Sequence, residues 1–271
     1  MGHADILTFQ EWKMKPIDDE IFKHVKAYQS RMGKNNSQIR ILDWGCGRGG
    51  SVLHFLEKGY DAYGIDVSRN TIERGRSLFF EMGYDFDSRI VLFENNECTS
   101  YLDNFFDFVV SYQVFEHVNN MESIAKEISR ITSLNGFGIH IFPGKYRLRE
   151  GHLIMPLIHW LPKNNFRKYM IIFFVLLGVE PKWNQLKKMN YKQKGNIYFD
   201  FSVYQTFYRS KKEIFQIFTN YGFSCYDRTI DHDKLKSLFG KTINYNFVRC
   251  FIGFVIPGMT SVTLTMEKMS I

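Results

Sequence analysis

The stretch "DWGCGRGG", residues 43–50, decides the fold class of this chain. Gly45, Gly47 and Gly50 stand in the spacing G-x-G-x-x-G, which is typical of turns that bind an adenosine-bearing cofactor. Without Cβ atoms, such a turn lets a ligand lie against backbone amides. Asp43 precedes the first glycine, and a carboxylate there favours a cationic ligand, such as an ammonium or a sulfonium, over a pyrophosphate.

Apolar strand-like runs alternate with helical patterns on both sides of this turn. The predicted strands are 38–44, 60–68, 88–95, 105–113, 137–144, 223–230 and the alternating run "SVTLTMEK". The predicted helices are 16–32, 49–59, 69–83, 119–136 with Gly136 as its C-cap, and 210–222. This alternation predicts an α/β fold with a doubly wound, mostly parallel sheet that binds ligands at the carboxyl ends of its strands. The 16–32 helix is expected to cover an edge of the sheet.

Asp66 closes the second predicted strand. An acid at this place accepts hydrogen bonds from both hydroxyls of a ribose. Nicotinamide enzymes and methyl donors share this feature, so Asp66 does not choose between them. The alternative interpretation is that Asp66 caps the helix that begins near Ser68.

Four stretches carry a resemblance to a known family. They read "ILDWGCGRGG", "YGIDVS", "FFDFVVSYQVFEHV" and "EISRITSLNGFGIHIFPG". In order and spacing they resemble the class I S-adenosylmethionine-dependent methyltransferases over residues 39 to about 143, with a weaker echo in the last strands. The resemblance implies a seven-stranded Rossmann-like sheet with an antiparallel last strand. It also implies S-adenosyl-L-methionine as cofactor and S-adenosyl-L-homocysteine as product.

The same resemblance implies roles for single residues. Gly45 and Gly47 would lie under the methionine part, and Asp66 would hold the ribose. Asn95 would meet the adenine amine, at a position where the family often has Asp. The loop after the fourth strand would bring two side chains nearest the sulfonium. The predicted cofactor-binding set is Asp43, Gly45, Cys46, Gly47, Asp66, Val67, Asn95, Asn96, Ser111 and Gln113.

Two histidines are candidate catalytic bases. His117 lies in "FEHV" (115–118), beside the expected methyl group, and His152 follows the fifth strand, where an insertion could fold over the acceptor. The alternatives are that His117 only shapes its loop or contacts the cofactor, and that His152 belongs to a packed lid. No group of His, Asp and Glu in the sequence has metal-ligand spacing, so no metal is predicted.

Length and composition suit one large α/β domain with an insertion, since 45 % of the 271 residues are hydrophobic. The first residues lack the features of a secretion signal, and the four cysteines form no C-x-x-C pair, so a cytoplasmic location is expected. The predicted organisation is an N-terminal helical cover (1–37), a cofactor-binding core (38–143), a basic and apolar lid over the acceptor (144–209) and completion of the sheet (210–271), with a second insertion at about 231–248.

The insertion carries the charge asymmetry. Eight basic residues and one acid lie between Lys163 and Lys194, which equals the net charge of +7 of the whole chain. Within it, "YMIIFFVLLGV" (169–179) is too short to span a bilayer, and its apolar residues are not segregated onto one face. It is interpreted as a buried or lid helix, or as an apolar helix with a cationic rim at the inner face of a membrane or on an anionic, lipid- or nucleotide-linked acceptor. RNA binding is a third interpretation.

The leading prediction is a methyltransferase that acts on a small-molecule or glycan-type acceptor, at oxygen. Nucleobase methylation is disfavoured, because "SYQV" stands where such enzymes often carry an Asn/Asp-Pro-Pro-aromatic motif. The alternatives are an NAD-dependent oxidoreductase, and a protein of the same fold that docks on RNA or a membrane without catalysis.

Overall fold

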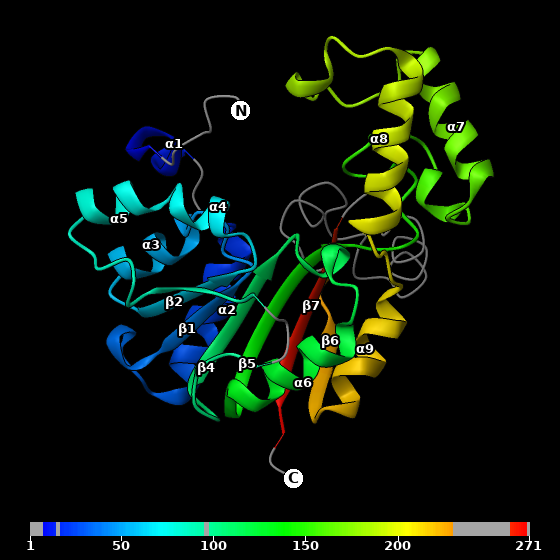
Figure 1. Cartoon of the computed structure of the whole chain (residues 1–271). Coiled ribbons are helices and arrows are strands. Elements are labelled where there is room, and N and C mark those ends of the chain that lie inside the picture. The colour runs from blue at the N-terminus through cyan, green and yellow to red at the C-terminus, as the bar shows by residue number, and fades with distance from the viewer. Residues whose placement is uncertain (1–7, 15–16, 95–97, 230–260, 270–271) are drawn as a thin grey trace, which may run out of the picture.

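Seven strands form one sheet in residues 8–14, 17–94, 98–229 and 261–269, which are the residues that the structure, a computed structural model, describes (Figure 1). Their order is β3-β2-β1-β4-β5-β7-β6. Neighbours are parallel except for the antiparallel pairs of β7 with β5 and β6. The expected α/β sheet with an antiparallel last strand is therefore confirmed. The strands are β1 (Arg40–Trp44), β2 (Asp61–Asp66), β3 (Ile90–Leu92), β4 (Phe106–Tyr112), β5 (Thr132–Pro143), β6 (Phe223–Asp227) and β7 (Ser261–Lys268).

Helices cover both faces of the sheet, because successive strand residues point to opposite sides. Ile41 packs with α2 and α3 on one face, whereas Leu42 packs with α6 and α9 on the other. These faces are the two main hydrophobic cores of the described residues. The helices are α1 (Phe9–Met14), α2 (Asp19–Met32), α3 (Gly50–Glu57), α4 (Arg69–Glu73), α5 (Arg76–Glu81), α6 (Met121–Ile131) and α9 (Lys211–Asn220), with short 3₁₀ turns η1 (Asn36–Gln38) and η2 (Phe115–His117).

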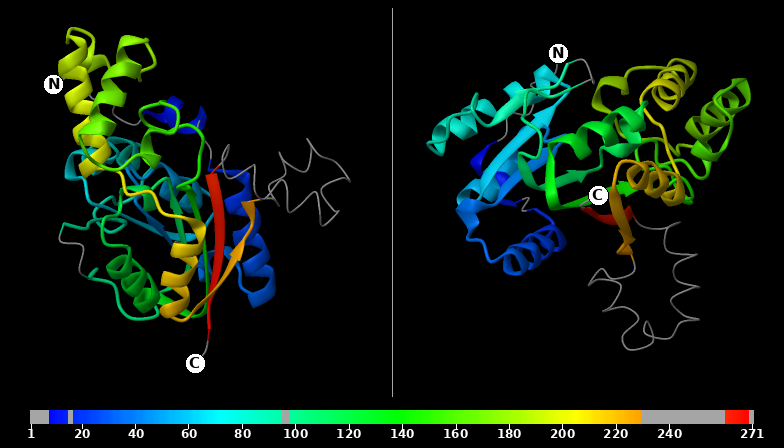
Figure 2. Two further views of the ribbon diagram at one scale, coloured as in Figure 1. Left: turned by 90° about the vertical axis from the view of Figure 1, so that its right-hand side faces the viewer. Right: turned by 90° about the horizontal axis from the view of Figure 1, so that it is seen from below.

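A third, smaller core belongs to the insertion. There α7 (Asn165–Leu176) and α8 (Tyr191–Tyr204) lie side by side beyond the carboxyl ends of the parallel strands (Figures 1 and 2), accompanied by the 3₁₀ turns η3 (Ile158–Trp160) and η4 (Asn184–Leu186). Ile171, Tyr198 and Leu153 are buried within this unit. We call residues 144–209 the lid; these limits stay a prediction, and the second insertion at about 231–248 lies outside the described residues.

The helix predicted over 119–136 is wrong at its end. α6 stops at Ile131, and β5 begins at Thr132, so Gly136 lies inside a strand and caps no helix. A register shift between Phe106 and Phe108 of β4 absorbs the extra residues of β5 at this point. Asn135 has a φ of 59°, a left-handed conformation that no helix interior contains.

The helix predicted over 69–83 is two helices. α4 and α5 are separated at Gly75, where a Cβ would stand 1.9 Å from the carbonyl oxygen of Arg48. This close approach to the glycine turn breaks the helix. The expectation that the 16–32 helix covers a sheet edge is also wrong, because α2 packs on a face, with the Tyr28 ring 5.9 Å from that of Phe108.

Candidate active site

The glycine turn between β1 and α3 has the backbone that its sequence requires. Gly45, Gly47 and Gly49 have φ values of 81°, 57° and 78°, which favour glycine. A Cβ on Gly45 would stand 2.4 Å from Cγ2 of Val114. The Gly45 amide donates to the Ile65 carbonyl at 2.8 Å, so the end of β2 fixes the turn.

Asp66 links this turn to the next helix. Its Oδ2 accepts a hydrogen bond from the Gly47 amide at 2.9 Å, and its Oδ1 accepts one from the Ser68 amide at 2.8 Å. The N-cap of α4 is Ser68 and not Asp66, because the Ser68 hydroxyl accepts from the Thr71 amide; Asp66 holds the Ser68 amide just before the helix. An ionised carboxylate offers about four acceptor positions, so two remain for a ligand.

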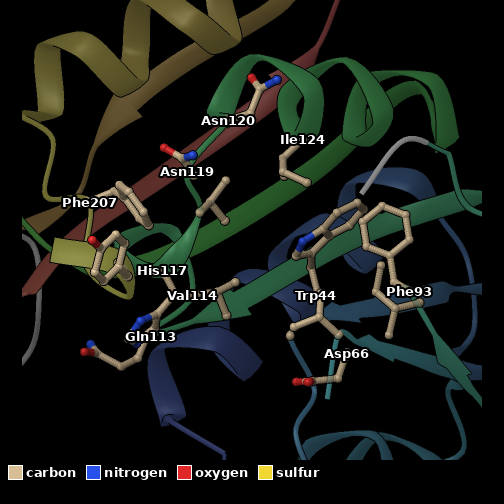
Figure 3. A pocket seen from close by; sticks show the side chains of 15 residues that line it. Trp44, Asp66, Phe93, Gln113, Val114, His117, Asn119, Asn120, Ile124 and Phe207 are labelled. Atoms are coloured by element: carbon tan, nitrogen blue, oxygen red, sulfur yellow. The ribbon is translucent and has the colours of Figure 1, made fainter. Parts of the chain in front are cut away.

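A cavity of about 620 Å³ opens beside Asp66, at the carboxyl ends of β1, β2 and β4 and below the lid (Figure 3). Its size falls within the range of about 300–1,000 Å³ typical of small-molecule sites. In Figure 3, Trp44, Asp66 and Phe93 lie on one side, whereas Gln113, His117 and Phe207 lie on the other. The cavity therefore has a strand-end side and a side that the lid helps to build.

The predicted cofactor residues divide into three groups. Those that line the cavity are Gly45, Asp66, Val67 and Gln113. Those that the structure places elsewhere are Asp43, Cys46, Gly47 and Ser111, of which Gly47 bonds the Asp66 carboxylate and the other three are buried. Asn95 and Asn96 lie outside the described residues. The roles of all these residues stay predictions.

Asp43 is buried behind the turn and 5 % exposed. Burial raises the pKa of this carboxyl to about 7, although a hydrogen bond with Ser51 acts against the shift. Ser111 is held from behind, because its hydroxyl lies 2.8 Å from Nδ1 of buried His140. Asp43 and Ser111 therefore lie buried behind the glycine turn and the strand ends, away from the cavity.

The two predicted histidines lie together although 35 residues separate them in sequence. The ring centroids of His117 and His152 are 4.8 Å apart. Nδ1 of His117 lies 2.6 Å from the Gln205 carbonyl, and burial lowers the pKa of this ring. Nδ1 of His152 lies 3.2 Å from Oε1 of Glu150. Burial opposes the charged form of His152, but the Glu150 carboxylate outweighs it and raises the pKa of His152.

Glu116 is the most unusual acid of this site. It is 2 % exposed, and neither carboxylate oxygen has a hydrogen-bond partner among the described residues. Burial raises its pKa to about 7, whereas its own backbone amide, and His152 and Arg147 through space, act in the opposite direction. Its backbone carbonyl accepts a hydrogen bond from the Phe207 amide at 2.6 Å, which fastens η2 to the lid. Burying an acid without a partner is costly, so the position of Glu116 requires an explanation.

Sequence reasoning missed most of the cavity wall. From the sequence, Glu116 in "FEHV" is predicted to shape its loop or contact the cofactor, and Glu150 shows no functional pattern. Trp44 lies within the quoted glycine stretch and could have been found there, because it is the last residue of β1. Other missed lining residues come from segments in which no binding-site pattern is predicted, among them Asn119, Asn120, Tyr204 and Phe207.

Comparisons with known proteins agree with this architecture. A family model described as a methyltransferase domain matches residues 42–139. Ubiquinone biosynthesis O-methyltransferase of Rickettsia conorii is 23 % identical over 182 residues, covering 64 % of this chain and 61 % of that protein. Sterol 4-C-methyltransferase strm-1 of Caenorhabditis elegans is 25 % identical over 118 residues, covering 44 % and 35 %. This chain thus spans less than two thirds of the length of either relative.

A solved structure of similar fold is geranyl diphosphate methyltransferase in complex with SAM, with a TM-score of 0.51 and 14 % identity over 92 % of this chain and 85 % of that one. This likeness concerns the fold alone. The sheet order and the glycine turn define a Rossmann-like α/β protein with its ligand cavity at the strand ends. Residues 42–139 match a methyltransferase domain, and the sheet has the Rossmann-like fold of class I S-adenosylmethionine-dependent methyltransferases. The family match favours a methyl donor over the nicotinamide alternative.

Proposed function

We propose that the chain transfers the methyl group of S-adenosyl-L-methionine to an oxygen of a small-molecule or glycan-type acceptor. One observation carries the proposal: the open glycine turn and Asp66 share a cavity with His117, whose ring touches that of His152. One side of the cavity is suited to a nucleoside, and the other to removing a proton. The relative named as an O-methyltransferase supports oxygen over other acceptor atoms.

The cavity fits the cofactor at the turn. The space beside Gly45 would be filled by any Cβ, so only glycine leaves room there. The two unused acceptor positions of Asp66 suit the two ribose hydroxyls. Asp43 lies behind the turn, and a cation bound nearby favours its charged form and lowers its raised pKa. When bound, the cofactor supplies a methyl group attached to a sulfonium. When the methyl group is transferred, the electron pair of the C–S bond stays on sulfur.

The protein contributes to the reaction by orienting the cofactor and the acceptor and by removing a proton from the acceptor hydroxyl. Orientation of two bound reactants is worth up to about 7–11 kcal/mol. A base adds about 10²–10⁴-fold for a hydroxyl acceptor. His152 suits this role because Glu150 raises the pKa of its ring and contacts Nδ1, which leaves Nε2 without a hydrogen bond to the described residues.

Cofactor binding tests the proposal first. Calorimetry should detect binding of S-adenosyl-L-homocysteine, and NAD should not bind. Asp66→Asn should weaken this binding about 100-fold, because two hydrogen bonds to a charged group are worth about 3–6 kcal/mol together. Asp85→Asn is the matched control, since Asp85 is exposed on a distant loop. Equal affinities in the Asp66→Asn variant and the wild type would contradict the ribose role.

The lid surface supports a membrane-facing element of the proposal. α7 is apolar on two sides: Ile171 and Val175 face the lid core, whereas an opposite stripe of Phe166, Tyr169, Phe173 and Leu176 is exposed. The helical spacing of this stripe explains why the sequence shows no single apolar face. Lys182, Lys187 and Lys188 are exposed in the connection between α7 and α8, and Lys192 is exposed in the first turn of α8. This connection lies at the end of the lid farthest from the sheet (Figure 1).

Exposed aromatic and aliphatic side chains beside cations fit an anionic lipid surface. No helix among the described residues is long and apolar enough to cross a bilayer. Of the eight basic residues, Arg167 is buried, Lys163 donates to carbonyls at the end of α8, and Lys194 pairs with Glu180 at 2.6 Å. The cations available to lipid are therefore fewer than the sequence suggests.

Vesicle sedimentation tests this surface. The chain should pellet with phosphatidylglycerol vesicles and not with phosphatidylcholine vesicles. Phe173→Ser should lower the affinity for these vesicles about 10- to 100-fold, because burying one aromatic ring contributes about 1.5–3 kcal/mol. Phe80→Ser is the control, since Phe80 is 87 % exposed on α5, away from the lid. Equal loss in both variants would refute a specific lid surface.

A further inference from the structure

Three side chains from two distant segments converge beside the cavity. One ring nitrogen each of His117 and His152 and one carboxylate oxygen of Glu116 lie within 4.8 Å of one another. Glu116 and His117 belong to η2, whereas His152 comes from the lid. This convergence exists only in the folded chain, so no ligand spacing is visible in the sequence.

Both histidines are already held in the way that metal ligands are held. Nδ1 of His117 faces the Gln205 carbonyl at 2.6 Å, which can only accept, so Nδ1 carries the proton and Nε2 is free. Nδ1 of His152 faces the Glu150 carboxylate at 3.2 Å, which again leaves Nε2 free. Histidines that bind metals donate their other N–H to a carbonyl or a carboxylate in this manner.

The Glu150 carboxylate is itself anchored. It is 3 % exposed and accepts hydrogen bonds from the His152 amide at 2.7 Å, from the Leu153 amide and from the Tyr208 hydroxyl. A buried carboxylate with four donors is a rigid support for an imidazole. The orientation of His152 is therefore fixed by the lid before any ligand arrives.

Unlike the side chains of His117 and His152, the Glu116 side chain has no partner in the described part of the chain that holds it. Its two buried oxygens accept no hydrogen bond within the described residues. An unpaired buried carboxylate is costly unless a cation compensates it. Among the residues that the structure describes, His117 and His152 thus each keep one ring nitrogen without a hydrogen bond, and Glu116 keeps both oxygens, so three neighbouring side chains can each offer a ligand atom.

We propose that Glu116, His117 and His152 bind a divalent transition-metal ion such as Zn²⁺ or Mn²⁺. Two imidazoles and one carboxylate form a ligand set that zinc uses in catalytic sites, where a fourth position stays open. Mg²⁺ prefers an all-oxygen shell and suits two nitrogen ligands poorly. A tetrahedral ion keeps its ligand atoms about 3.4 Å apart, so small rotamer changes complete the site.

The role of this ion rests on the proposed function, whereas its binding does not. His117 lines the cavity, so the open position of the ion faces the acceptor. An acceptor hydroxyl bound there has a lower pKa. Its O–H bond breaks and the proton passes to water. The oxygen then forms the new O–CH₃ bond as the C–S bond of the sulfonium breaks and its electron pair stays on sulfur. With the ion bound, Nε2 of His152 is a ligand and takes no proton, so the role of His152 as a base belongs to the metal-free chain.

Titration of the full chain, after removal of metals with a chelator, tests the site. Zn²⁺ or Mn²⁺ should bind with one ion per chain in calorimetry, and Mg²⁺ should bind far more weakly. Glu116→Gln and His152→Asn should each weaken binding by about 100-fold or more, and Tyr208→Phe by about 10-fold, since it acts through Glu150. Thermal melts of the metal-free variants confirm that each is folded.

His24→Gln is the matched control. Nε2 of His24 lies 3.4 Å from Oε1 of Glu20 on α2, which is a histidine–glutamate pair without a third ligand. This variant should bind metal as the wild type does. A wild-type chain that takes up neither ion, or a folded Glu116→Gln and His152→Asn pair that binds as tightly as the wild type, would overturn the proposal.

A second measurement separates the ion from the methyl transfer. Co²⁺ placed in the site should give visible ligand-field absorption, and acetohydroxamate, a bidentate oxygen ligand, should shift it through the open position. An unshifted spectrum would overturn the role in acceptor binding. S-adenosyl-L-homocysteine binding is measured on the same samples. Metal uptake without this binding would refute the proposed function alone, and the reverse result would refute the metal site alone.

Discussion

The two sides of the cavity are built in different ways. On the strand-end side, backbone groups form the wall. The Gly45 amide donates to the Ile65 carbonyl, and the Gly47 amide donates to the Asp66 carboxylate. On the lid side, side chains do it. His117 and His152 meet across two segments, supported by the buried carboxylate of Glu150.

This difference indicates which side of the cavity tolerates changes in its amino-acid sequence. A backbone turn fixed by glycines has few alternatives, because any Cβ at Gly45 collides with Val114. The lid has its own small core around Ile171 and Tyr198, so its side chains can vary without disturbing the sheet.

The largest expected effect is a loss of methyl-transfer rate from a substitution on the lid side of the cavity. His152→Gln should lower the rate of methyl transfer about 10²–10⁴-fold, which corresponds to about 3–5 kcal/mol. The affinity for S-adenosyl-L-homocysteine should stay within about threefold of the wild type, because His152 does not line the cavity at the glycine turn. Single-turnover rates and calorimetry measure the two quantities. A matching loss of affinity would show that the two sides are not separate.

The independence of the lid core is tested next. Ile171→Ala should lower the free energy of local opening of α7 and α8 by about 2–5 kcal/mol, since Ile171 is fully buried. Hydrogen exchange of amides in these helices measures it. Ile128→Ala in α6 is the matched variant in the sheet core and should lower the global stability instead. Identical exchange patterns in the two variants would contradict a separate lid core.

The glycine turn is tested by one added methyl group. Gly45→Ala should weaken cofactor binding about 100-fold, because the new Cβ enters the space between the turn and Val114. Gly83→Ala is the control: its φ is 76°, but nothing lies within 4 Å, so it should cost only about 1–2 kcal/mol of stability from backbone strain. Adding Val114→Ala to Gly45→Ala should restore part of the affinity.

The smallest expected effect concerns pH and Asp43. Its folded-state pKa is raised from 3.8 to about 7, so the folded chain binds the extra proton and loses stability as pH rises from about 4 to about 7. Relative to the wild type, Asp43→Asn should therefore become more stable across this window, by about 1–4 kcal/mol in total. Thermal melts at several pH values measure the difference. A difference that is constant with pH would contradict the raised pKa.

Most of the fold could be predicted because its pattern is local. The strands around 40–44 and 61–66 and the turn between β1 and α3 follow from apolar runs and glycine spacing. The errors occurred where a distant contact overrides the local pattern. Gly75 meets Arg48, which divides a helix, and β5 starts at Thr132, where pairing with β4 wins over helical periodicity.

The site could be predicted only in part. Gly45, Asp66, Gln113 and His117 line the cavity as expected. Glu116 could not be identified as unpartnered, because burial and hydrogen bonding are properties of the folded chain. Phe207 and Tyr204 reach the cavity only because α8 ends above it, at a sequence distance that no spacing rule covers.

The amino-acid order by itself determined the parallel sheet, the glycine bend and the acid at the end of the second strand, since each depends on neighbours a few positions away. Tertiary structure alone decided which side chains face each other above the bend. A long loop closes to bring His152 beside Glu116 and His117. Local sequence patterns cannot predict this contact, because its stability comes from the packing of the whole lid.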